Sequence, residues 1–218
     1  MNTQRKLILP FFILVVMVAA CKKKNEDPSL VVSHIPRMVI LGAPIISTSV
    51  GGSLPAEAGA NLFDEDGKST FIASPSSNNV DLSKPGFYSS TYKVTTKYGY
   101  TPSASRLVLV SSANASTDLS GQYARSTNGQ IINLTKKGPG LYVVDNIGGV
   151  KGSADFIFDV YIGFPTDLTV SVPTQSTPLG DLRCDKASYS PGAGGIDTLR
   201  WVVINPNFGT SVRTFIKQ

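Results

Sequence analysis

Residues that could support nucleophilic or metal chemistry are few in this chain of 218 residues. His34 is the only histidine, and it falls in a polar segment without a regular pattern. A Ser-His-Asp or Cys-His site needs a histidine held rigidly beside its nucleophile. The lack of a rigidly held histidine also argues against a zinc site built from histidine and cysteine. We therefore expect no catalytic site of these kinds, no metal site and no other cofactor.

Acidic residues occur in two groups whose spacing could matter. Asp155 and Asp159 share one side of a predicted strand, which places them ~13 Å apart. Glycosidase carboxylates need separations of about 5–5.5 Å or about 6.5–9.5 Å, so this pair alone does not suit that reaction. Asp64 to Gly67 resembles part of a calcium loop, but the EF-hand register would put Leu62 and Ala73 at ligand positions. We expect a solvated strand face and a polar turn.

Cys21 has the clearest chemistry of any residue in the chain. Arg5 and Lys6 precede an almost entirely apolar run, Leu7 to Val18, which is the layout of a secretory signal. The letters V-A-A-C that end at Cys21 resemble a lipobox, the motif of bacterial lipoprotein precursors. The resemblance implies that residues 1–20 are removed and that the Cys21 thiol carries lipid.

The alternative to a cleaved signal is an uncleaved transmembrane helix. Such a helix needs roughly 20 apolar residues, and fewer than that separate Lys6 from Lys22. Two or more acyl chains anchor a protein stably, at ~0.8 kcal/mol per buried methylene. We expect the membrane to be a partner through the lipid on Cys21, and the protein to lie in the cell envelope as an outer-membrane lipoprotein.

The net charge of +5 does not indicate a nucleic-acid partner. Removal of the signal takes away Arg5 and Lys6, and the remaining basic excess equals Lys22, Lys23 and Lys24. A nucleic-acid site needs basic residues clustered on a folded domain. These three lysines follow the lipidated cysteine instead, in a tether that we place at residues 21–36.

Beyond the tether the chain has the pattern of an all-β protein. Gly and Pro recur between short β-branched and aromatic runs, and no amphipathic helix is evident. A Ser/Ala/Asn-rich linker at residues 111–117 separates two predicted domains, 37–110 and 118–218. Cys184, in the second domain, is either a small buried hydrophobe or a reactive thiol.

The first domain contains a predicted hairpin. Lys84-Pro85-Gly86 indicates a turn, Tyr88 to Thr96 alternates as a strand, and Arg106 to Val110 returns. The letters V-D-L-S-K-P-G-F-Y-S-S-T-Y-K-V, with Y-G-Y and R-L-V-L-V, resemble the last hairpin of a bacterial immunoglobulin-like domain. The resemblance implies an immunoglobulin-like β-sandwich, with Tyr88 as a tyrosine corner whose hydroxyl bonds nearby backbone.

The second domain is predicted to be an antiparallel β-meander closed as a small sandwich or barrel. Residues 155–164 alternate strictly, which predicts a strand. Residues 173–197 are expected to form an unusually long loop, unless Leu182 to Cys184 forms a short strand. Two hairpins are predicted from strands that flank turns: 131–135 with 141–145, and 199–204 with 211–216.

The pairing of these two domains behind a lipobox resembles a family of two-domain Bacteroides-type surface lipoproteins. The resemblance covers most of the mature chain, from the hairpin above to the C-terminal pattern that opens with D-L-S-G-Q-Y. It implies a setting of glycan capture and import, and exposure on the cell surface or on the periplasmic face.

Aromatic residues are the remaining candidates for ligand contact. Phe208, Tyr98 and Tyr100 fall at predicted turns, where we expect exposed rings, and Tyr189 falls in the long loop. Trp201 alternates with apolar neighbours and is either a core residue or a contact residue. We expect a binding module for a glycan or another extracellular ligand. The alternatives are an interaction subunit of an outer-membrane complex, with the immunoglobulin-like domain as spacer, and an enzyme whose site the sequence does not reveal.

Overall fold

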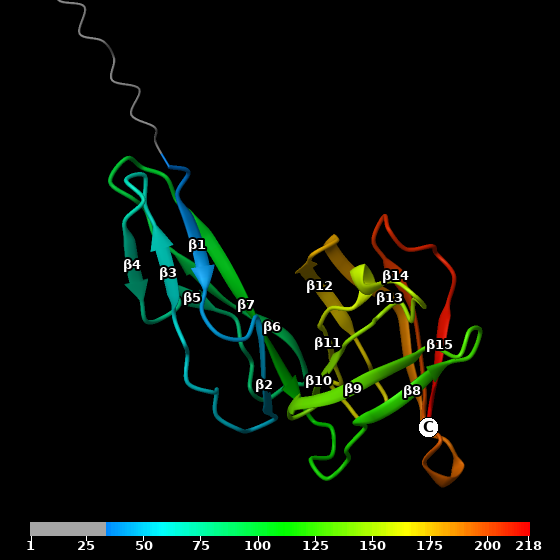
Figure 1. Ribbon diagram of the computed structural model, residues 1–218. Helices are drawn as coiled ribbons and strands as arrows, with labels where there is room; N and C mark the ends of the chain where they lie inside the picture. The colour runs from blue at the N-terminus through cyan, green and yellow to red at the C-terminus, as the bar shows by residue number, and fades with distance from the viewer. Residues whose placement is uncertain (1–33) are drawn as a thin grey trace, which may run out of the picture. The chain divides into compact units, whose positions relative to one another are not determined.

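The computed structural model describes residues 34–218, which contain the strands β1 to β15 and two 3-10 helices, η1 (Ala154–Phe156) and η2 (Ala193–Gly195) (Figure 1). The prediction of an all-β protein is confirmed. The predicted signal, Cys21 and the tether as far as residue 33 lie outside the described residues. Within residues 34–218, no helix is long and apolar enough to cross a membrane.

The N-terminal half is an immunoglobulin-like sandwich of two sheets, as predicted. The first sheet has the order β1-β3-β4, with β1 at Arg37–Ile40, β3 at Ala60–Phe63 and β4 at Ser69–Ile72. The second has the order β2-β7-β6-β5, with β2 at Ile45–Ser49, β7 at Ser103–Ser111, β6 at Gly86–Lys93 and β5 at Ser77–Asn78. Strand β2 pairs parallel to β7. The chain crosses between the sheets through Gly42, whose φ of +74° favours glycine.

The predicted β6–β7 hairpin is present, with its preceding turn three residues earlier than expected. The Lys84 N–H donates to the Asp81 carbonyl at 3.3 Å, and Gly86 already belongs to β6. The Asp81 carboxylate accepts the Ser83 N–H at 2.9 Å, which stabilises the turn at this position. The Tyr88 hydroxyl donates to the Lys84 carbonyl at 2.9 Å, so the predicted tyrosine corner is confirmed.

The C-terminal half is a single antiparallel sheet with the order β11-β10-β9-β8-β15-β14-β13-β12. Pairing of β8 with β15 joins the first strand of this meander to the last, and one isolated bridge, Gly163 to Ser171, links β11 with the start of β12. The sheet therefore forms a nearly closed barrel, visible in Figure 1 as the curved β8–β15 region. Its strands are β8 Gly121–Arg125, β9 Ile131–Gly138, β10 Leu141–Val144, β11 Val160–Gly163, β12 Val172–Thr177, β13 Gly180–Ser190, β14 Thr198–Ile204 and β15 Arg213–Lys217.

Side chains fill the interior of this barrel. One apolar cluster includes Trp201, Phe215, Tyr123 and Ile162, all fully buried. An eight-stranded barrel has an interior just wide enough for side chains to fill. The barrel is thus a packed core, and any ligand must bind at its surface or its ends.

Two predictions for this half were wrong. Residues 173–197 are not a long loop: they form most of the β12–β13 hairpin, followed by η2, and the alternative of a strand at Leu182 to Cys184 is confirmed because these residues lie in β13. A β-bulge between Asp185 and Ser188, with Lys186 at a φ of 53°, interrupts the alternation that would have revealed β13. The predicted strand 155–164 begins only at Val160, because residues 154–156 form η1.

Strand β7 connects the two halves. Its last residues are buried on both faces, since Val108 and Val110 alternate with Leu109 and Ser111 and all four are buried. Leu109 packs against Ile45 and the barrel residue Leu141. Ser111, which the sequence analysis placed in the linker, is instead the last residue of β7, and its hydroxyl donates to the Phe164 carbonyl at 2.6 Å. Independent folding of the two predicted domains stays a prediction.

Candidate functional site

The best candidate for a ligand site in the barrel is a surface depression beside the β14–β15 turn, which we call the rim pocket. Its volume is about 440 Å³, which falls in the usual range of small-molecule sites. It combines apolar side chains with charged and polar ones. Its lining residues are Asp181, Arg183, Val203, Ile204, Asn205, Pro206, Phe208 and Thr210.

The wall of the rim pocket is held in place by two asparagines. The Asn205 amide donates to the carbonyls of Leu179 and Asp181, both at 3.0 Å. Asn205 also accepts the N–H of Asn207 at 2.9 Å, and the Asn207 amide donates to the Leu179 carbonyl at 3.3 Å. These bonds tie the β14–β15 turn to the β12–β13 turn. The pocket is therefore formed before any ligand binds.

Phe208 lies beneath this turn instead of being exposed at its tip, so the expected exposure was wrong. The residue is only 8% exposed and belongs to the barrel core. Its ring meets Phe156 edge to face, with centroids 5.1 Å apart, and a Cβ added at Gly148 would overlap it. The Arg213 guanidinium lies 5.5 Å from the ring centroid. Phe208 can line the pocket with its edge, but its faces are occupied.

Two arginines that the sequence analysis missed organise the same end of the barrel. Buried Arg213 donates to the carbonyls of Gly148 at 3.1 Å and Gly209 at 3.2 Å. Arg125 donates to the carbonyls of Gly148 and Gly149 at 3.1 and 3.2 Å. Burial, followed by the charge of Arg125, lowers the pKa of Arg213. Alternation in β15, which puts Arg213 and Phe215 on one face, was a signal for the inward arginine.

Tyr189 and Trp201 are built into the barrel away from the rim pocket. Tyr189 pairs with Leu199 at the start of β14, whereas Phe208 follows the end of that strand, so the structure does not bring the two candidates together. The Tyr189 hydroxyl donates to Asp197 at 3.1 Å, and burial raises its pKa to about 12. Trp201 is 0% exposed and donates its indole N–H to the Ile147 carbonyl at 2.8 Å. Its ring is out of reach of a surface ligand.

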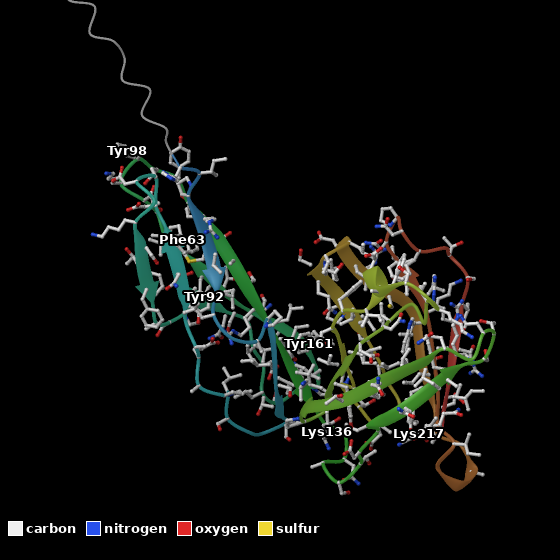
Figure 2. The ribbon with its side chains drawn as sticks, in the orientation of Figure 1. Phe63, Tyr92, Tyr98, Lys136, Tyr161 and Lys217 are labelled. Carbon is white, nitrogen blue, oxygen red and sulfur yellow. The ribbon has the colours of Figure 1, made fainter. Side chains whose placement is uncertain are left out.

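Tyr98 and Tyr100 are exposed, as expected, with 66% and 54% of their surfaces accessible. They lie in the β6–β7 loop of the sandwich, and Figure 2 shows Tyr98 at the end of the sandwich where β1 begins. They are thus on the other half of the described chain from the rim pocket. The aromatic candidates divide into separate locations and do not form one site.

Cys184 is a buried thiol in the barrel core. Burial raises its pKa to about 12, so the thiol stays protonated and unreactive near neutral pH. Asp64 accepts the N–H groups of Asp66 and Lys68 at 3.0 and 2.8 Å, which makes the acidic segment a polar turn, as predicted. Within residues 34–218, no group of three acidic, histidine or cysteine side chains is placed to hold a metal ion.

Comparisons with known proteins describe what this chain is similar to. No protein-family model matches it, and no curated protein matches it. Among solved structures, the chain is similar to the crystal structure of a lipoprotein from Bacteroides thetaiotaomicron. The two share 20% sequence identity at a TM-score of 0.39, and the match covers 84% of this chain and 100% of the other.

Proposed function

We propose that this protein is a lipid-anchored binding module of the cell envelope, and that its barrel holds an extracellular glycan in the rim pocket. The anchor rests on the sequence that ends at Cys21, with its basic start, apolar run and V-A-A-C motif. The outer membrane is the proposed location. The sandwich acts as a spacer that carries the barrel, because β7 joins both through a shared apolar contact.

The rim pocket is the observation that carries the proposal. A sugar presents hydroxyl groups beside apolar C–H faces, and it needs both kinds of partner. Asp181 can accept hydrogen bonds and Arg183 can donate them, while Ile204 and Pro206 supply apolar surface. Because the asparagine bonds form the wall in advance, little conformational entropy is lost when a ligand binds.

The proposed activity is binding without catalysis. His34 is exposed at the start of the sandwich, where its backbone N–H donates to the Glu65 carbonyl at 3.0 Å. Cys184 is buried and protonated. Asp155 lies in η1 and Asp159 directly precedes β11, so neither lies in a strand. None of these groups lies among the residues that line the rim pocket.

The ligand proposal is tested with residues 28–218 on a glycan array, followed by calorimetry on the best sugar. Asp181→Asn and Arg183→Gln should each weaken binding by roughly tenfold, because each removes a charge-assisted hydrogen bond. Arg200→Gln is the matched control, since Arg200 is an exposed arginine of β14 outside the pocket. Equal loss in the control, or no loss in either pocket variant, would contradict the site.

The anchor proposal is tested separately with Cys21→Ser. A serine hydroxyl cannot replace the thiol in lipid transfer, so the variant should leave the detergent phase in a phase-partition assay. Full retention of the variant in the detergent phase would show that the anchor is not lipid on Cys21.

A further inference from the structure

The end of the sandwich where the described chain begins also carries three exposed large side chains, Ile35, Tyr98 and Tyr100. The His34 N–H donates to the Glu65 carbonyl at 3.0 Å, which fixes the start of the chain beside the β3–β4 turn. Ile35 is 88% exposed at this point. The β6–β7 loop, with exposed Tyr98 and Tyr100, lies at the same end, as Figures 1 and 2 show.

The loop that presents the two tyrosines is well held. The Thr96 N–H donates to the Tyr100 carbonyl at 2.8 Å, and the Thr96 hydroxyl donates to the buried Glu65 carboxylate. The Lys97 ammonium pairs with Asp66 and lies 4.7 Å from the centroid of the Tyr98 ring. The β6–β7 loop and the β3–β4 turn are thus joined to one another, and these bonds hold the backbone that carries the exposed rings.

Two exposed cations at this end, Arg37 and Lys68, could contact an anionic surface. Exposed Asp66 pairs with Lys97, and half-buried Asp64 keeps its negative charge while it accepts N–H groups of its own turn. The exposed cations Arg37 and Lys68 form no ion pair with a carboxylate of the described residues. An anionic lipid headgroup would meet these cations without displacing an existing ion pair.

The lipid on Cys21 would lie close to this end. Thirteen peptide steps separate Cys21 from His34. A chain of this length reaches at most ~47 Å when fully extended. The end that begins at His34 is therefore within reach of the bilayer that holds the lipid.

We propose that this end of the sandwich rests on the surface of the anchoring bilayer, with Tyr98 and Tyr100 at the level of the lipid headgroups. The inference depends on the proposed lipid anchor. Tyrosine suits this position because its ring is apolar and its hydroxyl is polar, and tyrosines are enriched at membrane interfaces. Strand β7 leads from this loop to the barrel over nine residues, about 27 Å.

Tryptophan quenching in vesicles tests this orientation. The only native tryptophan, Trp201, is fully buried and gives a constant background. The full lipidated chain carrying Tyr98→Trp is incorporated into phosphatidylethanolamine–phosphatidylglycerol vesicles with a lipid brominated near the top of its acyl chain. Tyr100→Trp is a second probe of the same loop. Leu168→Trp is the matched control, because Leu168 is 64% exposed but lies far from the two tyrosines along β7. Its neighbour Asp167 accepts the N–H of Asn114, which follows the opposite end of β7.

Brominated lipid should quench the added emission of both loop probes by about half and leave the Leu168→Trp probe unchanged. Vesicle flotation of the same samples reports the anchor independently. Chain that floats but shows equal quenching at all three positions would overturn the membrane-facing end and leave the anchor intact. Chain that does not float would overturn the lipid anchor and, with it, this inference.

Discussion

The sandwich and the barrel contain the same local motif in different surroundings. The letters D-L-S occur at Asp81 and again at Asp118, five to seven residues before Tyr88 and Tyr123. In each, the aspartate accepts the serine N–H at 2.9 Å. Hydrogen bonds from this serine lower the pKa of the carboxyl group, chiefly from the Ser83 hydroxyl at Asp81 and from the Ser120 N–H at Asp118. In each, the tyrosine hydroxyl donates to the carbonyl four residues earlier. Tyr88 is only half-buried, whereas Tyr123 is fully buried.

The two halves also differ in what fills their cores. The barrel has a large apolar cluster around Trp201. The sandwich has a small cluster around Tyr92, and beside it the buried Arg106 pairs with Glu57 at 3.2 Å. The Tyr92 hydroxyl donates to the same carboxylate at 2.9 Å. The core of the sandwich thus depends on a polar network, whereas the core of the barrel depends on apolar packing.

The largest effect should come from the barrel core. Phe208→Ala should lower the free energy of unfolding by about 3–5 kcal/mol, because it removes a buried ring and leaves a cavity beside Phe156. Urea denaturation followed by Trp201 fluorescence measures this change. A loss below about 1 kcal/mol would mean that Phe208 is exposed in solution and free to contact a ligand.

The sandwich network should respond strongly to loss of one partner. Arg106→Leu should cost about 2–3 kcal/mol, because it leaves Glu57 and the Leu41 carbonyl without the guanidinium. Exposed Arg200→Leu is the control. If the halves fold independently, the circular-dichroism transition of Arg106→Leu will shift ahead of the Trp201 fluorescence transition. Coincident shifts would show one cooperative unit.

The contact between sandwich and barrel should be sensitive to a single methyl group. A Cβ at Gly163 would overlap the Phe87 ring and meet Leu109, so Gly163→Ala should cost about 1–2 kcal/mol. Gly209→Ala is the control, since nothing lies within 4 Å of its added Cβ. Equal thermal stability of the two variants would show that this contact is loose.

Alkaline pH should weaken the barrel through Cys184. Its thiol keeps its proton in the folded barrel, with a pKa of about 12, but in the unfolded chain it would lose that proton near the ordinary thiol pKa of 9.0. The unfolded state therefore binds fewer protons above this pH, and stability falls as pH rises. Between pH 9 and pH 10 the loss should be about 1 kcal/mol. Urea midpoints at the two pH values measure it, and Cys184→Ala should lack this component.

The shared motif can be tested directly with one variant in each half, and the variant at Tyr88 should have the smallest effect of all. Tyr123→Phe should cost about 1–2 kcal/mol, because it leaves the Leu119 carbonyl unpaired in a buried place. Tyr88→Phe should cost about 0.5 kcal/mol, because water can replace its hydroxyl at the Lys84 carbonyl. Thermal denaturation of both variants gives the comparison. Equal losses would show that burial does not determine how much this hydrogen bond contributes to stability.

The sequence by itself determined the elements whose signals are local. Proline, glycine and alternation located the β6–β7 hairpin and the β14–β15 hairpin, and the resemblance to an immunoglobulin-like hairpin implied the corner at Tyr88. These features depend on residues a few positions apart, so their backbone preferences and short hydrogen bonds are sufficient to specify them.

Only the tertiary structure decided which residues meet. The bulge at Lys186 concealed β13, and the pairing of β8 with β15 that closes the barrel joins segments about ninety residues apart. The burial of Phe208 depends on Phe156, Gly148 and Arg213, none of which is its neighbour in sequence. A turn residue is exposed or buried according to what packs against it, and that is a property of long-range contacts that local patterns do not contain.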